Sequence, residues 1–253
     1  MSDLFSLAGR IAVVTGGAGQ VGSEIVRGLE ERGARVAVFD VAAERFRVDV
    51  TDSSALENAT NEVVAEWGVP HVLVNAAALD SPPDAPAEEA GPFESYPEQS
   101  FDEVMAVNVK GTFLACQVVG GRMAAEGRGS IINISSIYGM LSPVQDLYDF
   151  RRRDGETFFK PVAYSVSKSA LYNLTRYLAT YWASSGVRVN TLTLAGVRND
   201  QPQEFVDAYS ARMPLRRMAD VGEVVGPVVF LASDASSYVT GANLVADGGW
   251  SAW

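Results

Sequence analysis

Short apolar runs and amphipathic segments alternate along almost the whole chain of 253 residues. IAVVT (11–15) and RVAVF (35–39) have the β-branched composition of buried strands, and QVGSEIVRGLEERG (20–33) repeats its apolar residues at helical spacing. The same patterns recur downstream, as strands at 71–75, 130–135, 187–194 and 243–246 and as helices at 52–68, 100–127, 162–186 and 220–233. This alternation predicts an α/β fold, a doubly wound parallel sheet of about seven strands with helices on both faces.

Two of the expected helices carry a serine that is followed three residues later by a glutamate. Ser54 precedes Glu57, and Ser100 precedes Glu103. In a capping box the serine side chain accepts a backbone N–H of the first turn, while the glutamate accepts the serine's own N–H. We therefore expect these two helices to be capped by these serines.

One segment interrupts the alternation. SPPDAPAEEAGPFESYPEQ (81–99) is rich in proline and acidic residues and could link two domains. Because strands and helices alternate unchanged after it, we prefer a long surface loop within one domain. The sequence therefore predicts a single domain over 1–253, with an insertion around 80–98.

The charge of the chain argues against a nucleic-acid partner. Its formal net charge is -11 and its sequence pI is about 4.6, whereas binding to a phosphate backbone needs a broad basic surface. Three consecutive arginines at 151–153 do not change this, because aspartates at 146, 149 and 154 neutralise them locally.

The scarce residue types bear on compartment and metals. A single cysteine, Cys116, cannot form an intramolecular disulfide, which suits a reducing compartment, and only His71 could join it in a zinc site. The first ten residues are too short and polar for a signal peptide, and no uninterrupted apolar run reaches the ~18 residues of a membrane span. We expect a soluble cytoplasmic protein with no metal and no membrane partner.

A glycine-rich loop, TGGAGQVG (15–22), joins the first strand to the first helix. Gly17, Gly19 and Gly22 fit the pattern G-x-G-x-x-G, which is informative here because it follows a strand and opens a helix. Glycines let the backbone approach a pyrophosphate closely, and the start of the helix offers free N–H groups. The loop therefore predicts a Rossmann-type dinucleotide site.

Asp40 ends the second strand, 18 residues after Gly22, where a carboxylate can accept hydrogen bonds from the ribose hydroxyls of NAD. The same charge would repel the 2′-phosphate of NADP, and no lysine or arginine in the loop offsets it. The expected cofactor is therefore NAD rather than NADP. Asp49 could contact the adenine amino group or could be an ordinary turn residue.

The segment YSVSK (164–168) lies on an expected helix, so Tyr164 and Lys168 share one face. A phenol with a pKa of ~10 is a poor base, but a neighbouring ammonium group favours the phenolate. A serine at the end of the strand 130–135, in NISSIYG, could hold a substrate oxygen beside this tyrosine. Together with the glycine loop, these residues indicate proton transfer next to a nicotinamide.

These motifs resemble the short-chain dehydrogenase/reductase family, and the resemblance extends from Gly9 to Gly249. It implies that Ser136 polarises the substrate oxygen, that Tyr164 is the general acid/base, and that Lys168 lowers the pKa of the tyrosine and binds the nicotinamide ribose. It further implies that Asn108 supports a water chain to the lysine. The cofactor contacts implied by the motifs are Gly16, Gly17, Gly19, Gln20, Val21, Gly22, Asp40, Asp49, Val50, Asn75, Ala76, Ala77, Tyr164, Lys168, Ala195, Gly196 and Val197.

Several positions depart from the family pattern. Gln20 stands where members of this size usually have glycine, the N-N-A-G motif reads Asn-Ala-Ala-Ala at 75–78, and the usual Pro-Gly after the sixth strand reads Ala195-Gly196. The helix that normally follows the second strand is nearly absent, because eight residues separate Asp40 from Asp49. We still expect a cofactor site despite these changes, but they put individual contacts with the nicotinamide in question.

Ser136 and Tyr164 are 28 positions apart, more than is usual in the family, yet both must reach one substrate oxygen. Residues 140–162 must therefore leave the sheet and return beside the site, either as a plain surface loop or as a lid over the substrate. Its aromatic residues suit an apolar or sugar face, and one of Arg151, Arg152 and Arg153 could bind an anion. A partial resemblance to family members from bacterial surface-sugar and flagellin-modification pathways suggests a sugar or sugar-phosphate substrate.

Three functions are compatible with these motifs. The leading one is an NAD-dependent oxidoreductase acting on a secondary alcohol or ketone. A nucleotide-sugar epimerase or dehydratase is suggested by the position of Gly19, and a non-catalytic NAD sensor would not need the serine, tyrosine and lysine. The resemblance also implies a homodimer or homotetramer, and we expect Trp250 and Trp253 to pack against a neighbouring subunit.

Overall fold

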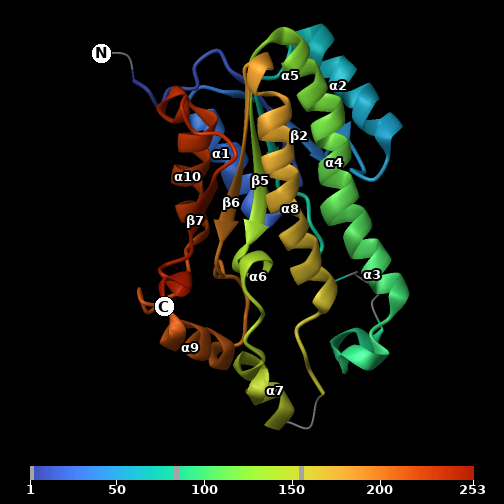
Figure 1. Cartoon of the computed structure of the whole chain (residues 1–253), viewed down its shortest axis with the longest axis vertical. Coiled ribbons are helices and arrows are strands. Elements are labelled where there is room, and N and C mark those ends of the chain that lie inside the picture. Colours follow the sequence, from blue (N-terminus) through green and yellow to red (C-terminus); the bar gives the residue numbers. More distant parts are fainter. Residues whose placement is uncertain (1–2, 82–85, 154–156) are drawn as a thin grey trace.

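The computed structural model describes residues 3–81, 86–153 and 157–253, so both expected insertions are described except at 82–85 and 154–156. All pairings in its seven-stranded sheet are parallel, in the spatial order β3-β2-β1-β4-β5-β6-β7 (Figure 1). The strands are β1 (Ile11–Thr15), β2 (Arg35–Asp40), β3 (Phe46–Arg47), β4 (Val72–Asn75), β5 (Gly129–Ser136), β6 (Val187–Leu194) and β7 (Asn243–Ala246). The predicted doubly wound α/β fold is confirmed, and the strand order reverses between β1 and β4, where such folds bind their ligands.

Helices cover both faces of this sheet. On one face lie α1 (Gln20–Glu31) and α10 (Val225–Ala232), and on the other lie α2 (Ser53–Trp67), α8 (Val162–Tyr181) and a long composite helix over 98–126 (Figure 1). Successive strand residues alternate between the faces, so Val13 packs in the core beneath the α2 layer and Val14 in the core beneath α1 and α10.

The composite helix begins at Glu98 rather than at the expected Ser100. It consists of α3 (Glu98–Met105), η3 (Ala106–Gly111), α4 (Thr112–Ala115), η4 (Cys116–Gly120) and α5 (Gly121–Glu126), of which η3 and η4 are π-helical. Single π-helical turns inside α-helices are frequent at functional sites. Here η3 carries Asn108, one of the residues that the motifs implicate.

Both expected capping boxes are wrong. The N-cap of α2 is Asp52, whose carboxylate accepts the backbone N–H groups of Ser54 and Ala55. Ser100 is buried within α3, which has Pro97 at its N-cap and no side-chain cap. A capping box does occur before α10, where Asp220 and Glu223 cap η7 (Val221–Val224). The aspartate two positions earlier takes the cap of α2 because its carboxylate is a strong acceptor at a helix start.

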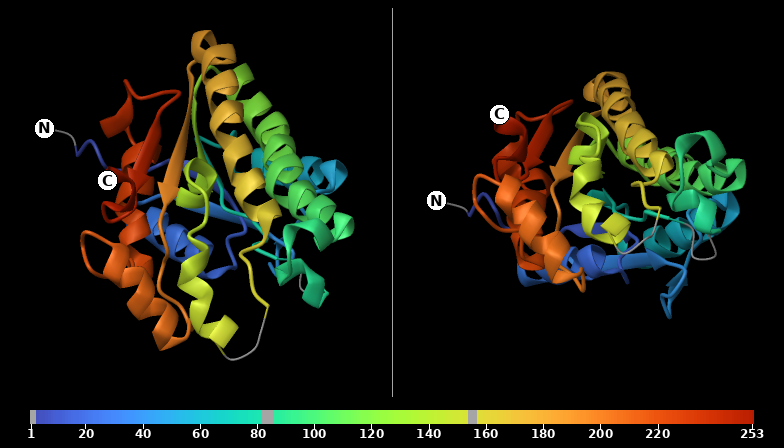
Figure 2. Two further views of the ribbon diagram at one scale, coloured as in Figure 1. Left: turned by 60° about the horizontal axis from the view of Figure 1, so that its bottom comes forward. Right: turned by 90° about the horizontal axis from the view of Figure 1, so that it is seen from below.

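Shorter elements gather at the carboxyl ends of the strands. Figure 2 (right) views this end, where α7 lies between α9 and the segment that leads into α3. The elements of this region are η1 (Ala87–Ala90), η2 (Phe93–Ser95), α6 (Ile137–Met140), η5 (Gln145–Tyr148), α7 (Asp149–Arg153) and α9 (Gln203–Arg212). The remaining turns are η6 (Ala183–Ser185), η8 (Asp234–Ser236) and η9 (Trp250–Ala252).

A third apolar cluster lies under these shorter elements. It joins Tyr138 of α6, Tyr148 of η5 and Tyr209 of α9 with Trp250. Trp250 is only 8% exposed and stacks on Tyr209 with ring centroids 4.6 Å apart, so it packs within its own chain and not, as expected, against a neighbour. Trp253 is 79% exposed, and its packing against a second subunit stays a prediction.

The composite helix over Glu98–Glu126 is long and apolar enough, by length and composition, to cross a membrane. Half of its apolar window is buried in the fold, where the helix packs against α2, α8 and the sheet. Burial of this kind is typical of a core helix.

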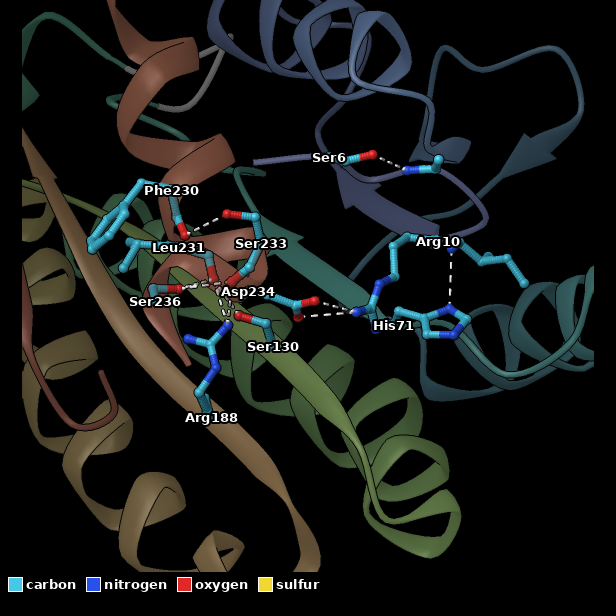
Figure 3. Close-up of polar contacts among 12 residues, drawn as sticks. Ser6, Arg10, His71, Ser130, Arg188, Phe230, Leu231, Ser233, Asp234 and Ser236 are labelled. Atoms are coloured by element: carbon cyan, nitrogen blue, oxygen red, sulfur yellow. Dashed lines mark hydrogen bonds and ion pairs between the residues drawn. The ribbon is translucent and has the colours of Figure 1, made fainter. Parts of the chain in front are cut away.

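The amino ends of the strands are fixed by side-chain contacts to the backbone (Figure 3). The Nδ1 atom of His71 accepts the backbone N–H of Ile11 at 3.1 Å. Arg188 donates to the carbonyl of Leu231 near the end of α10 and to that of Val239 after η8, and Arg10 pairs with Asp234. These contacts lie at the end of the sheet opposite to α6, α7 and α9, so His71 is structural, as its position before a strand suggested.

Candidate active site

The glycine loop brings the start of α1 against the ends of β1 and β4. Gly16 has φ +67°, and a Cβ there would lie 2.5 Å from the Cα of Ala77. At Gly22 a Cβ would lie 2.0 Å from the carbonyl oxygen of Gly16, so neither position accepts a side chain. Gly19 caps α1 without a side-chain hydrogen bond, which leaves the first N–H groups of the helix available to a phosphate.

A groove of about 750 Å³ runs over this loop. Most of the expected cofactor contacts line it, namely Gly16, Gly19, Gln20, Val21, Gly22, Asp40, Asp49, Val50, Ala76, Ala77 and Tyr164. A neighbouring cavity is lined by four more of the expected contacts, Lys168, Ala195, Gly196 and Val197, together with Val21, Ala76 and Tyr164. The two spaces meet at Tyr164, so the structure brings the motifs together around one residue.

Asp40, the last residue of β2, also lines the groove. Its two carboxylate oxygens accept the backbone N–H groups of Ala18 and Ala42, at 3.0 Å and 2.9 Å. Each oxygen keeps a second lone pair, so the carboxylate can still accept ribose hydroxyls. Asp49 accepts both the N–H and the hydroxyl of Thr51, which is the bonding of a turn aspartate, although it also lines the groove.

Two expected contacts lie outside both cavities. Gly17 packs beneath the loop, where a Cβ would lie 2.9 Å from Val38 of β2. Asn75 is buried, and its amide nitrogen donates to Asn133 and to the sulfur of Cys116. Gly17 therefore supports the loop and Asn75 supports the end of β4, and neither forms part of the groove surface.

Gln20, which replaces a glycine of the family pattern, has a contact of its own. Its amide donates to the backbone carbonyl of Arg198 at 2.8 Å. The side chain therefore ties the glycine loop to the segment after β6. This segment is further held to Ala219 through the backbone N–H of Arg198.

Ser136, Tyr164 and Lys168 meet where β5 ends and α8 passes over it. Ser136 is the N-cap of α6, and α6 is held to α8 by the hydroxyl of Ser169, which donates to the carbonyl of Gly139 at 2.7 Å. Lys168 is 4% exposed, and its ammonium group donates to the carbonyl of Ile134 at 3.0 Å and lies 5.7 Å from the ring centre of Tyr164.

The electrostatics of this cluster explain why it needs a cationic partner. Burial raises the pKa of the Tyr164 phenol, and the carboxylate of Asp80 raises it further, while a hydrogen bond with Ser136 acts in the opposite direction. Burial lowers the pKa of Lys168 to about 8. Positive charge added beside the ring, such as an oxidised nicotinamide, favours the phenolate and allows the tyrosine to act as a base.

Asn108 holds the segment that follows β4. Its side chain exchanges two hydrogen bonds with the backbone of Leu79, at 2.7 Å and 2.8 Å, and donates to the hydroxyl of Ser167 at 2.9 Å. Asn108 thereby fixes Leu79, and with it the adjacent Asp80, against α8. Its contact on α8 is Ser167, the residue before Lys168. Within the described residues it acts as a positioning residue.

Comparison with known proteins agrees with this geometry. Residues 16–251 match a family model described as enoyl-(acyl carrier protein) reductase. The chain belongs to the short-chain dehydrogenase/reductase family. The D-threitol dehydrogenase of Mycolicibacterium smegmatis is 34% identical over 268 residues, which cover 97% of this chain and 94% of that protein.

Two solved structures of the family show how the fold is used elsewhere. A short-chain dehydrogenase from Leptospira borgpetersenii with bound NAD+ has a TM-score of 0.85 and 30% identity, covering 99% of this chain and 96% of that one. A gluconate 5-dehydrogenase from Burkholderia cenocepacia in complex with NADP and tartrate has a TM-score of 0.81 and 27% identity, covering 99% and 98%. This family member is therefore an oxidoreductase that uses a nicotinamide cofactor on a small-molecule alcohol.

The cavity on the substrate side of Tyr164 has a volume of about 330 Å³. Beyond the expected residues its wall includes Asp80, Tyr138, Tyr148, Lys160, Gln201, Phe205, Tyr209 and Met218, so that with Tyr164 five of the lining residues are aromatic. Sequence reasoning missed these residues individually, although it placed the insertion that carries Tyr148 and Lys160 beside the substrate. The segment 199–205, which follows β6, supplies Gln201 and Phe205.

The arginines at 151–153 do not line this cavity in the described part of the chain. Arg152 donates to the carbonyls of Gln145 and Phe158, at 2.9 Å and 3.3 Å, and pairs with Asp149. Arg151 lies over the ring of Phe158, 4.0 Å from its centre. The expectation that one of them faces the substrate is therefore not supported, because the carbonyls and rings of the insertion itself engage Arg151 and Arg152.

Proposed function

We propose that this enzyme oxidises a secondary alcohol of a small polyhydroxylated substrate, a sugar alcohol or sugar acid, and uses NAD in preference to NADP. The observation that carries the proposal is the meeting of Ser136, Tyr164 and Lys168 between two spaces. One is a groove that reaches Asp40, and the other is a small cavity with aromatic, aliphatic and polar residues in its wall.

Each of the three residues has a distinct task in this reaction. The hydroxyl of Ser136 holds and polarises the substrate oxygen, and the phenolate of Tyr164 removes the proton from the alcohol. The ammonium group of Lys168, 5.7 Å from the ring centre, favours that phenolate. NAD, when bound, accepts the hydride from the substrate carbon. In the reverse direction the phenol returns the proton to the carbonyl oxygen.

The preference for NAD is supported by the charges of the groove. Asp40 presents a carboxylate where the adenosine ribose is expected. Among the described residues that line the groove there is no lysine or arginine to bind a 2′-phosphate. Of the two solved relatives, one holds NAD+ and the other NADP, so the preference rests on the residues of this chain.

The substrate class is supported by the cavity and by the relatives. Aromatic rings pack against the C–H faces of a sugar chain, while hydroxyl and amide groups bind its oxygens. Relatives named for threitol and gluconate act on such compounds. A phosphorylated substrate has less support, because Arg151, Arg152 and Arg153 do not line the cavity and Lys160, which does, is paired with Asp80.

We further propose a homodimer or homotetramer located in the cytoplasm. The large side chains of Phe113, Val166, Tyr177 and Tyr181 are exposed on the composite helix and α8, the two helices that the family resemblance assigns to subunit contact. Exposed aromatic and aliphatic side chains of this kind suit an interface between copies of the chain.

The proposal is tested by measuring the formation of NADH and NADPH with a panel of tetritols, pentitols, hexitols and aldonic acids, their phosphate esters, and simple secondary alcohols. We expect turnover of at least one polyol or sugar acid with NAD. Tyr164→Phe should lower kcat by about 10²–10⁴-fold while NAD still binds, because only the proton relay is removed. A variant that keeps more than about a tenth of kcat would exclude Tyr164 as the acid/base.

A further inference from the structure

Lys160 is the last residue but one before α8, and two contacts fix its position. Its backbone N–H donates to the side-chain carbonyl of Gln145 at 2.9 Å, and the neighbouring Phe159 donates its N–H to the carbonyl of Ala90 at 2.7 Å. The contact with Gln145 lies within the insertion 140–162, and the contact with Ala90 joins this insertion to the one around 80–98. The side chain of Lys160 is only 11% exposed and lines the substrate cavity.

Two ammonium groups therefore flank the ring of Tyr164. That of Lys160 lies 5.2 Å from the ring centre and that of Lys168 lies 5.7 Å from it. Only the second belongs to the motif on α8. Lys160 comes from the insertion between Ser136 and Tyr164, so this chain adds a cation to the site.

Lys160 also has a counter-ion. Its ammonium group binds both carboxylate oxygens of Asp80, whose side chain is 59% exposed. Asp80 follows Leu79, which Asn108 holds in place, so the pair bridges two segments that are each fixed independently. Asp80 lines both the cofactor groove and the substrate cavity.

The charged and titratable groups that face Tyr164 come from every element around it, namely Lys168 and Tyr172 of α8, Lys160 before α8, Tyr138 of α6, Tyr209 of α9, and Asp80 after β4. A cation within about 4–6 Å favours an ionised phenol and an anion disfavours it, each by roughly one to three pKa units. Within the ion pair, Lys160 therefore favours ionisation of the Tyr164 phenol, and Asp80 disfavours it.

We propose that Lys160 is a second positioning cation for the general base Tyr164, and that Asp80 limits its effect by pairing with it. Neither residue touches the reacting atoms in this role. Lys160 stabilises the phenolate alongside Lys168, and Asp80 holds the lysine at the ring while cancelling part of its charge. The inference rests on the proposed function, since it concerns the same tyrosine.

The test is the pH dependence of kcat/KM for alcohol oxidation, which rises as Tyr164 deprotonates. Lys160→Met should move this rise to higher pH by about one unit or more, because a nearby positive charge is lost. Asp80→Asn should move it to lower pH, because the lysine remains and its counter-ion is gone. Lys160→Arg should restore most of the wild-type profile. Arg153→Ala, an exposed position of the same insertion, serves as the control.

A second readout does not depend on turnover. Tyrosine labelled with ¹³C at the ring carbon that bears the hydroxyl is titrated by NMR in the NAD complex, and the Tyr164 signal is identified by its loss in Tyr164→Phe. The same two opposite shifts are expected there. They would support the inference even if no alcohol of the panel is oxidised, a result that would by itself overturn the proposed function.

Three results would overturn the inference. Shifts in the same direction for Lys160→Met and Asp80→Asn would show that the pair only ties the two insertions together. An unmoved profile with a higher KM for anionic substrates alone would make Lys160 a substrate-binding residue. The pH profile and KM could also stay unchanged in both variants while thermal unfolding shows that they are folded. Lys160 and Asp80 would then have no role in the reaction.

Discussion

At the scale of single residues, we expect the choice between NAD and NADP to depend on one carboxylate. Asp40 is held by two backbone N–H groups and lines the groove, so it cannot turn away from a bound ribose without losing both bonds. Asp40→Ala should lower kcat/KM for NAD by about ten- to a hundredfold, since hydrogen bonds to a charged group are worth ~1.5–3 kcal/mol. The value for NADP should rise or stay level, so the gap between the cofactors narrows.

The measurement for this prediction is kcat/KM with each cofactor at a fixed alcohol concentration. Glu44→Ala is a matched control, because it removes an exposed carboxylate of the same turn that does not line the groove. A wild-type enzyme that prefers NADP would contradict the assignment of Asp40, whatever the variant does.

At the scale of elements, the insertion that contains α7 depends on Arg152 for its shape. The guanidinium group donates to carbonyls on both sides of α7, at Gln145 and at Phe158, and so closes the segment on itself. Arg152→Ala should leave these carbonyls without a partner and loosen the wall that carries Tyr148. We expect KM to rise about equally for neutral and anionic substrates, by roughly three- to tenfold, the worth of one hydrogen bond.

The control for this prediction is Arg153→Ala, whose side chain is exposed on the same helix. Steady-state kinetics with a sugar alcohol and its phosphate ester distinguish the alternatives, and the NAD dissociation constant should stay unchanged. A selective loss of the phosphorylated substrate in Arg152→Ala would revive the hypothesis that this arginine binds a substrate anion.

At the scale of the whole molecule, stability against acid depends on the amino end of the sheet. Partial burial of His71 lowers the pKa of its imidazole, and the nearby Arg128 and Arg10 lower it further. The unfolded chain therefore binds a proton more readily, so stability is fully present above the unfolded pKa of ~6.5 and falls as the pH drops below it. The free energy of unfolding should decrease between pH 7.5 and pH 5.5.

His71→Asn isolates this contribution, because an amide can still accept the N–H of Ile11 but does not titrate. Urea unfolding at the two pH values should show a smaller pH dependence in the variant than in the wild type. Equal dependence in both proteins would assign the acid sensitivity to carboxylates elsewhere in the fold.

The amino-acid sequence by itself determined the features that rest on local periodicity. Alternating strands and helices predicted the parallel sheet, and a spacing of four on a helix placed Tyr164 and Lys168 on one face. The glycine loop was predicted from its glycines. At Gly16 and Gly22 other backbone atoms lie so close that a side chain would not fit. Helix caps were predicted less well, because α2 begins before Ser54 and Asp52 accepts the N–H groups of Ser54 and Ala55.

Only the tertiary structure decided which side chains meet across long stretches of chain. Asp80 and Lys160 are 80 positions apart, and no pattern in either segment shows that they pair beside Tyr164. The direction of the Arg152 side chain could not be predicted from the sequence either. It depends on the carbonyls of Gln145 and Phe158, which come within reach only when the insertion has folded back on itself. Such contacts are set by the packing of segments remote in sequence, whereas the sheet, the loop and the tyrosine–lysine pair follow from neighbours along the chain.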